Sequence, residues 1–354
     1  MLLHMDFPSG SVGLYGTNAA KMLDGMYAEN NAALVEDPDP NVTGNVMWYS
    51  ADIFGVLLRK VLPASVTSLG FANRVYFPSL PSSIGASNFN YVISLRDGGN
   101  TDICSITVNT DGRIAAYRGT VNGGVLLGTS AAPAITAAAW HHVEVKFVLS
   151  ATVGTVEVRV NGVTVLNLTG QNTGAGPCTQ VAQGHRTFSD ATGNFYSKDW
   201  ILWDTTGAFN NNFMGSCSVK ELIPDGDISA NWALTGAANH YGAVNEAPPD
   251  DDTKYIYAVT PAPAADVMSL TNLPVDVTSV RGLMVINRSK NTDGGDGKLQ
   301  AGLVSGASTQ LYTDRQLTTA YTYWTDISET DPATAAAWLP GAVNAMNLRL
   351  NRTL

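Results

Sequence analysis

The sequence is poor in charged residues and has no long apolar run. Only 14% of its 354 residues are charged, and 20 Lys and Arg against 30 Asp and Glu give a formal net charge of −10. Nucleic-acid binders need cationic surface to displace counterions from phosphates, and anionic membranes attract cationic segments, so this balance argues against both partners. No stretch reaches the roughly 18–20 apolar residues that span a bilayer, so we expect no membrane insertion.

Cysteine is also scarce. Cys104, Cys178 and Cys217 lie far apart, and their odd number leaves at least one outside any intramolecular disulfide. We interpret them as buried small hydrophobic residues rather than as a disulfide framework or a metal site. The first ten residues, MLLHMDFPSG, lack the charged region and apolar run of a secretory signal, which a secreted adhesin or lectin would carry.

The common catalytic signatures are missing as well. There is no Gly-x-Ser-x-Gly, His-Glu-x-x-His, Cys-x-x-Cys or phosphate-binding Gly-rich loop before Lys-Ser/Thr. Retaining glycosidases need two carboxyl groups about 5–5.5 Å apart, and no strand carries such a closely spaced acidic pattern. We interpret Glu144 and Glu157 as solvated charges on the outward faces of strands. We therefore expect no enzyme activity and assign no catalytic residue.

What the sequence has in quantity is alternation and turns. Over 140–168, apolar residues from Val143 to Val160 alternate with polar ones, which is typical of strands with one buried face. Asn161-Gly162 favours a type I′ hairpin turn, because both residues tolerate positive φ. We predict three antiparallel strands in one sheet of a two-sheet sandwich, with these side chains buried: Val143, Val145, Val156 and Val158.

Turn signals recur about every 8–12 residues, which is the rhythm of an all-β sandwich. Further strands are predicted at 71–77, 91–95, 106–108, 114–117, 125–127, 200–203, 217–223, 254–259, 280–287, 298–304 and 321–327. Pro133 favours a loop over a helix in the Ala-rich stretch 131–139. The best helix candidate is 331–346, where Asp331-Pro332 fits a helix start and Pro340 would interrupt the helix.

The composition shifts after residues 224–227, and we place a domain boundary there. Residues 1–226 would form a jelly-roll domain whose first 60 residues are irregular, and 227–354 a second, smaller β-sandwich. The segment APPDDD, 247–252, is predicted to be a loop, because two prolines and three adjacent like charges disfavour regular structure.

Several clusters could bind a ligand, and for each we favour a structural role. His141 and His142 are successive strand residues that point to opposite faces, so we expect one buried and one exposed imidazole. Asp97, Asn100 and Asp102 could ligate Ca²⁺, but short acidic turns are common. Asp250-Asp251-Asp252 is predicted to be a solvated loop. The 7 Trp and 13 Tyr could form a sugar-stacking platform, although we assign most of them to cores or interfaces. We predict no metal and no cofactor.

Two sets of segments resemble known virion proteins. WHHVEVKF and GTVEVRVNGVTVLN look like the laminin-G-like or concanavalin-like jelly roll found in many of them. The second set resembles, in its order, a family of minor structural proteins of tailed bacteriophages. It comprises FYSKDWILWDTTGAFNNNFMGSCSVKELIPDGD, NWALTG, AVNEAPPDDDTKYIYA and WTDISETDPATAAAWLPGAVNAM. The resemblance extends from about residue 70 to about residue 346. Ser197–Trp200 departs from it, because an acidic pair is expected there, which argues against calcium at this strand.

The resemblance implies a non-enzymatic structural protein of a virion, tail-associated and in contact with other virion proteins and the host surface. Such a protein is assembled in the host cytoplasm and leaves by lysis, so it needs no secretory signal. The alternative is a carbohydrate-binding receptor-recognition protein with a host-surface glycan as partner. An aromatic groove with Asp or Asn at its rim would favour that alternative.

The high apolar content also predicts a homo-oligomer, a trimer or a ring, because exposed apolar patches usually mark interfaces and closed symmetry limits open-ended association. We expect five side chains of the N-terminal 60 residues to pack on a neighbouring copy: Met22, Met26, Tyr27, Trp48 and Tyr49.

Overall fold

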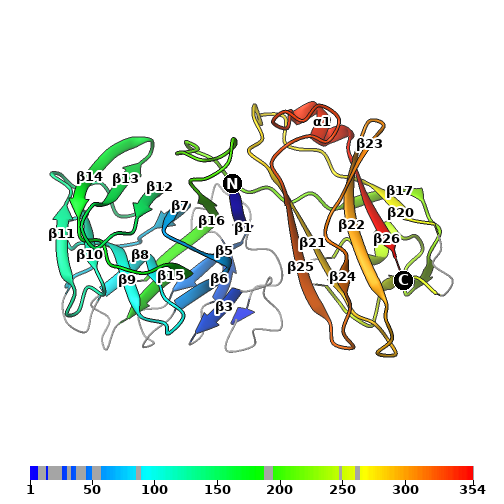
Figure 1. The fold of residues 1–354 in the computed structure, drawn as a ribbon, viewed down its shortest axis with the longest axis horizontal. Coiled ribbons are helices and arrows are strands. Elements are labelled where there is room, and N and C mark those ends of the chain that lie inside the picture. Colours follow the sequence, from blue (N-terminus) through cyan, green and yellow to red (C-terminus); the bar gives the residue numbers. More distant parts are fainter. Residues whose placement is uncertain are drawn as a thin grey trace. The chain divides into compact units, whose positions relative to one another are not determined.

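The structure is a computed structural model, and its regular structure is almost entirely β (Figure 1). It describes residues 1–6, 13–14, 26–29, 33–36, 45–49, 57–84, 89–186, 194–246, 249–259 and 264–353. The chain divides into two compact units, unit 1 (Met1–Val219) and unit 2 (Lys220–Leu354). This division lies a few residues before the predicted boundary at 226. No helix among the described residues is long and apolar enough to cross a bilayer.

Unit 1 consists of two antiparallel sheets. Sheet A has the strand order β14-β13-β12-β7-β16-β5-β4-β2, with β1 beside β16, and sheet B has the order β11-β10-β9-β8-β15-β6-β3. The strands of sheet A are β1 (Leu2–Asp6), β2 (Gly13–Leu14), β4 (Ala33–Glu36), β5 (Asn45–Tyr49), β7 (Ser68–Tyr76), β12 (Trp140–Val148), β13 (Gly154–Val160), β14 (Val163–Gln171) and β16 (Phe195–Asp204). Those of sheet B are β3 (Met26–Glu29), β6 (Leu57–Val66), β8 (Phe89–Arg96), β9 (Asp102–Val108), β10 (Ile114–Arg118), β11 (Val125–Thr129) and β15 (Cys178–Arg186).

The three strands predicted over 140–168 are confirmed as β12, β13 and β14. Val145 pairs with Val158 across β12 and β13. Asn161 and Gly162 have φ values of 50° and 82°, the left-handed backbone that a type I′ turn requires. All four valines predicted to be buried have no exposed surface. Alternation therefore located both the strands and their buried face.

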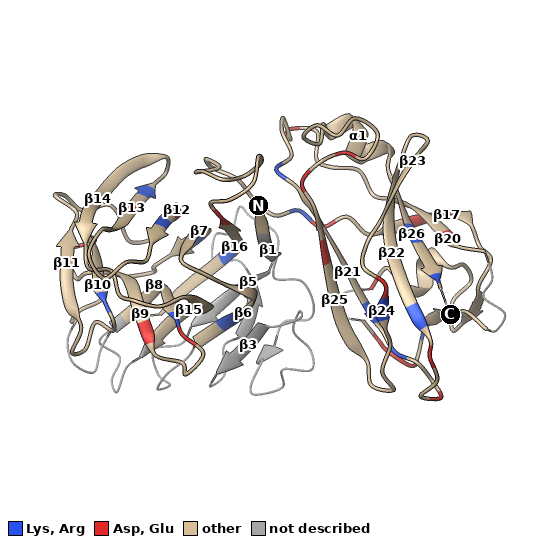
Figure 2. Cartoon of the chain, viewed as in Figure 1, with Lys and Arg blue, Asp and Glu red and all other residues tan. Residues whose placement is uncertain are grey.

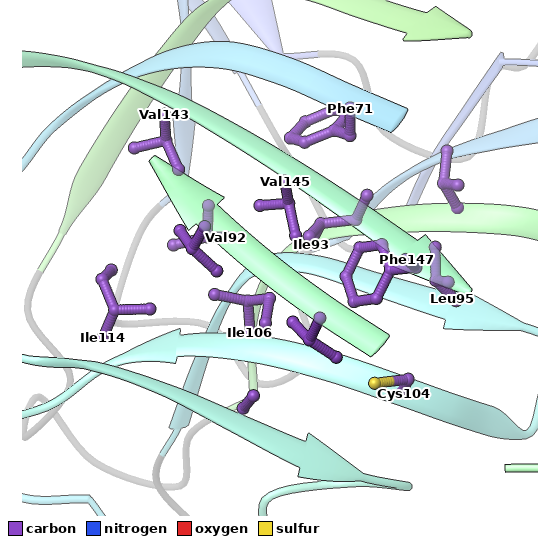
Figure 3. Close-up of a cluster of buried hydrophobic side chains, with 14 of the residues drawn as sticks. Phe71, Val92, Ile93, Leu95, Cys104, Ile106, Ile114, Val143, Val145 and Phe147 are labelled. Carbon is purple, nitrogen blue, oxygen red and sulfur yellow. The ribbon is translucent and has the colours of Figure 1, made fainter. Parts of the chain in front are cut away.

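The core of unit 1 lies between the two sheets. Val143, Val145 and Phe147 of sheet A pack in one cluster with side chains of sheet B such as Val92 and Ile106 (Figure 3). Figure 3 also shows the Cys104 thiol at the edge of this cluster. Two stacked antiparallel sheets with a continuous apolar core confirm the predicted jelly-roll sandwich.

The expectation of an irregular N-terminal segment is wrong for the described residues. Strands β1 and β5 both pair with β16, and β3 pairs with β6, so this segment supplies strands to both sheets. These strands are short and find their partners up to about 200 residues away in sequence, which leaves little local signal. Met26, Tyr27, Trp48 and Tyr49 lie in β3 and β5, whereas Met22 lies outside the described residues.

Unit 2 is a second, smaller β structure. A six-stranded sheet has the order β17-β20-β26-β22-β23, with β24 beside β22, and β18-β19 and β21-β25 form two-stranded ribbons. Met268, Leu303, Trp338, Val343 and Leu350 are at the centre of its core. The elements are β17 (Pro224–Ser229), β18 (Ala233–Thr235), η3 (Tyr241–Ala243), β19 (Tyr255–Tyr257), β20 (Asp266–Leu270), β21 (Leu283–Ser289), β22 (Lys298–Ser305), β23 (Ser308–Leu311), β24 (Arg315–Gln316), β25 (Thr322–Ser328), α1 (Pro340–Ala345) and β26 (Asn347–Arg352).

Two predicted elements are wrong. Residues 217–223 form no strand. The helix predicted over 331–346 is limited to α1, which Pro340 begins rather than interrupts, since proline fits the first helical turn. Asp331 instead closes a tight turn, because its side chain accepts a hydrogen bond from the Ala333 amide and its carbonyl accepts one from the Ala335 amide. The loop predicted at 131–139 is confirmed.

We expect Val158→Asp to prevent folding of unit 1, because a carboxylate in this core would lose its hydration without gaining a partner. Val163→Asp is the matched control, since Val163 on the adjacent strand is 65% exposed. Circular dichroism and thermal unfolding should show a folded Val163→Asp protein and an unfolded or insoluble Val158→Asp protein. Two equally stable variants would contradict the assigned core.

Candidate functional site

The outward face of sheet A is covered by the chain itself. Residues 205–219, which we call the strap, follow β16 and run antiparallel to β12. The Lys146 ammonium donates to Asn212 Oδ1 at 2.9 Å. Further along, His142 Nε2 lies 3.8 Å from Cys217 Sγ. The polar row of β12 is thus a binding surface for the chain's own backbone and side chains.

Glu144 is the central anchor of the strap. Its Oε1 accepts hydrogen bonds from the backbone amides of Met214, at 2.8 Å, and Gly215, at 3.0 Å. The residue is only 1% exposed, so the prediction of a solvated strand charge is wrong. Alternation identified the face on which Glu144 lies, but it carries no information about a segment 70 residues away that covers this face.

A second anchor is aromatic. The Phe213 ring has the Arg159 guanidinium 3.9 Å and the Lys146 ammonium 5.0 Å from its centroid, which are cation–π distances. Arg159 also donates two hydrogen bonds to Glu157 Oε1, at 3.1 and 3.0 Å. Glu157 remains at the outward face, as predicted, with its side chain 25% exposed and paired with this arginine.

Beyond Gly215 the strap crosses onto neighbouring strands. Arg74 on β7 donates to Ser216 Oγ at 3.2 Å and pairs with Asp199 Oδ2 at 3.2 Å. Asp199 in turn accepts the Val219 amide at 3.0 Å. Asp199 lies in the Ser197–Trp200 stretch that departs from the phage family, where its carboxylate holds the end of the strap.

Both histidines of the predicted pair are buried, so the expectation of one exposed imidazole is wrong. His141 is 7% and His142 is 2% exposed. The strap covers His142 on the outward face, and Asn161 of the hairpin turn lies 3.3 Å from His141 Nδ1. Burial, and then the positive charge of Arg74, lower the pKa of His142 to about 4. His142 is therefore neutral at pH 7.

The predicted turn at Asp97 is confirmed, and the calcium alternative loses one of its ligands. Asp97 Oδ1 accepts the amides of Gly99 and Thr101, both at 2.8 Å. Asp102 is instead directed into unit 1, where it pairs with Arg96 at 2.6 Å and accepts the Tyr91 hydroxyl at 2.8 Å. Among the described residues no three His, Cys, Asp or Glu side chains lie together as metal ligands.

Two of the three cysteines have the predicted buried character. Burial raises the pKa of Cys104 to about 12 and that of Cys178 to about 11, so both are inert thiols at neutral pH. Cys217 is half-buried on the strap, beside His142.

In unit 2 the acidic loop does not stay solvated as expected, because each of its three carboxylates faces a cation. Asp250 lies 3.8 Å from Lys254, Asp251 pairs with Arg288, and Asp252 pairs with Lys290. Figure 2 marks the charged residues of both units as isolated segments along the chain. Local pairing therefore neutralises the run of like charges.

Tyrosines surround two of these ion pairs. Arg288 and Tyr323 are cross-strand partners in the β21–β25 ribbon, with the guanidinium 4.8 Å from the ring centroid. Burial, and then a hydrogen bond to Asp252, raise the pKa of Tyr321 well above its ordinary value. We call this group the tyrosine surface; it comprises Asp251, Asp252, Tyr255, Tyr257, Arg288, Lys290, Tyr321 and Tyr323.

The aromatic residues thus divide between core and surface. Trp203, Trp338 and Tyr91 are fully buried, as expected for most of this class. The tyrosine surface was not identified from the sequence, because its parts are separated by about 30 residues at each step. The alternating Tyr-x-Tyr pairs at 255–257 and 321–323 are the signal that could have indicated it.

No protein-family model and no curated protein sequence matches this chain. Among solved structures it is similar to a sialidase, with a TM-score of 0.36, 11% identity and coverage of 51% of this chain and 17% of that one. It is also similar to the alginate lyase Aly36B, with a TM-score of 0.35, 15% identity and coverage of 55% and 93%. The receptor binding domain of botulinum neurotoxin C/D mosaic serotype gives 0.37, 10%, 55% and 47% in the same order. Likeness at this level carries no argument about function.

We expect acid to destabilise unit 1 partly through His142. An unfolded histidine takes up a proton near pH 6.5, whereas folded His142 does so only near pH 4, so stability falls as the pH drops through this window. A shift of this size corresponds to roughly 3 kcal/mol. Urea unfolding at pH 7 and pH 4 should show a smaller acid loss for His142→Gln than for the wild type. Equal losses would contradict the assignment.

Proposed function

We propose that this chain is a non-enzymatic structural protein of a bacteriophage virion, associated with the tail and in contact with other virion proteins. The ordered resemblance of residues 195–346 to tail-associated structural proteins is one support. The observation that carries the proposal is the strap, because Glu144, the acidic residue best placed for chemistry on the outward face of sheet A, is used to hold Met214 and Gly215. A carboxylate buried beneath its own chain serves architecture rather than a substrate.

We also propose that the chain forms a homo-oligomer, a trimer or a ring docked on the tail. Unit 1 has exposed apolar side chains on its outer strands, with Val125 46%, Leu126 53% and Val163 65% exposed. These strands, β11 and β14, are the last in their sheets. Exposed apolar side chains at a sheet edge support contact with another chain.

An intact-particle map by electron cryomicroscopy tests location and assembly together. We expect the density of this chain in symmetric copies at the tail, and light scattering of the full chain should give a closed oligomer. Removal of residues 1–60 is not a suitable probe, because it deletes strands of both sheets. A full-length monomer at high concentration, together with particles that lack the chain, would contradict the proposal.

The enzymatic alternative has its own test. Incubation of the full chain with host-derived polysaccharides should release no oligosaccharides, because Glu144 is buried and Glu157 is paired with Arg159. Chromatography of the supernatant provides the readout. Release that is abolished in Glu144→Gln or Glu157→Gln would show that the structural assignment is wrong.

A second candidate function is carbohydrate-binding receptor recognition. The tyrosine surface favours it, because exposed aromatic rings lie beside Asp251 and Asp252 on one side of unit 2. The two functions are compatible, since a tail protein can hold its place in the particle through unit 1 and contact the host surface through unit 2.

A further inference from the structure

We infer that the tyrosine surface of unit 2 is a binding site for a neutral glycan, an inference that rests on the second candidate function above. The surface joins three segments of unit 2: the loop 250–254, the strand β19 and the ribbon β21–β25. Its chemistry combines aromatic rings with charged groups that are already paired.

The aromatic part supplies flat apolar surface next to polar tips. Tyr255 and Tyr257 lie on the same side of β19, with their ring centroids 5.8 Å apart, and Tyr257 is 41% exposed. Tyr255 is close enough to Tyr321 to influence its ionisation, which links β19 to the ribbon. The C–H face of a sugar ring packs on such rings, while the phenol hydroxyls remain available to its hydroxyl groups.

The charged part fixes these rings in place. The Arg288 guanidinium lies 5.1 Å from the Tyr321 centroid and 4.8 Å from that of Tyr323, and the Lys290 ammonium lies 4.3 Å from Tyr321. The Tyr321 hydroxyl donates to Asp252 Oδ1 at 3.1 Å. Side chains that are held before a ligand arrives lose less conformational entropy when it binds.

The pairing of charges selects the class of glycan. Arg288 is held by Asp251 and Lys290 by Asp252, so the surface has no net charge. An acidic sugar would have to compete with a carboxylate for its cation and would face Asp252, whose side chain is 73% exposed. A neutral hydroxyl can instead donate to the remaining lone pairs of Asp252 and leave both ion pairs intact. The arrangement therefore favours neutral hexose chains over uronate or sialate chains.

A protein partner is the rival occupant, because Tyr and Arg are also enriched at the energetic centres of protein interfaces. Exposed carboxylates, however, are depleted at the centres of such interfaces. Asp251 and Asp252, with side chains 37% and 73% exposed, adjoin the rings directly. This rim of hydrogen-bond acceptors suits a polyhydroxylated ligand better than an apolar protein surface.

The test is affinity electrophoresis of the full chain in native gels that contain dextran, mannan, galactan or β-1,3-glucan, with alginate and polysialic acid as acidic probes. The variants are Tyr257→Ala, Tyr323→Ala and the conservative Tyr323→Phe. Leu311→Ala, on β23 of the six-stranded sheet, is the matched control, because Leu311 is 45% exposed and lies outside the tyrosine surface. Thermal unfolding of each variant confirms that unit 2 is folded.

We expect at least one neutral polysaccharide to retard the wild type. Its dissociation constant should rise about tenfold in both alanine variants, which corresponds to about 1.4 kcal/mol, and stay within twofold in Tyr323→Phe and Leu311→Ala. Retardation that the tyrosine variants leave unchanged would overturn the assigned surface but not glycan recognition. Retardation by acidic probes alone would overturn the neutral class. No retardation by any probe would overturn both this inference and the second candidate function, while the structural role in the virion would still stand.

Discussion

The account depends on one hydrogen-bonded carboxylate, Glu144, at the centre of the outward face of sheet A. Two consecutive backbone amides of the strap donate to its Oε1, and the carboxylate is almost fully buried. Its Oε2 has no hydrogen-bond partner among the described residues, so the two amides are the contacts that offset the desolvation of the charge. Lys146 and Arg159 beside Glu144 and Asp199 beyond it hold the strap on either side, and the whole face is closed as a result.

The strap also leads directly into unit 2. Its last residue, Val219, is held by Asp199, and the second unit begins at Lys220. The connection therefore leaves unit 1 from a fixed point on sheet A instead of from a loose linker after β16. One set of contacts thus fills the sheet face and fixes the origin of the second unit. For a component of a particle, a defined point of departure is useful, because it limits how far the second unit can move from the first.

The local pattern predicts much of this fold and little of the site. Alternation identified β12, β13 and β14 and their buried valines, because the strands are adjacent in sequence and joined by an Asn-Gly turn. It could not identify β1 or β5, whose partner β16 is distant, and it assigned Glu144 and His142 to solvent because periodicity gives the direction of a side chain and not its cover. The ion pairs and tyrosines of unit 2 depend on tertiary contacts between distant segments, which single-sequence patterns do not contain.

The most direct test of the strap is hydrogen–deuterium exchange at the amides of Met214 and Gly215 in the full chain at neutral pH. These amides lie outside any strand, but they donate to a buried carboxylate. The account predicts that they exchange as slowly as amides in the centre of β12, and that Glu144→Ala speeds their exchange selectively. Exchange in the wild type as fast as in the exposed turn at 151–153 would contradict it, because the strap would then not be held on sheet A.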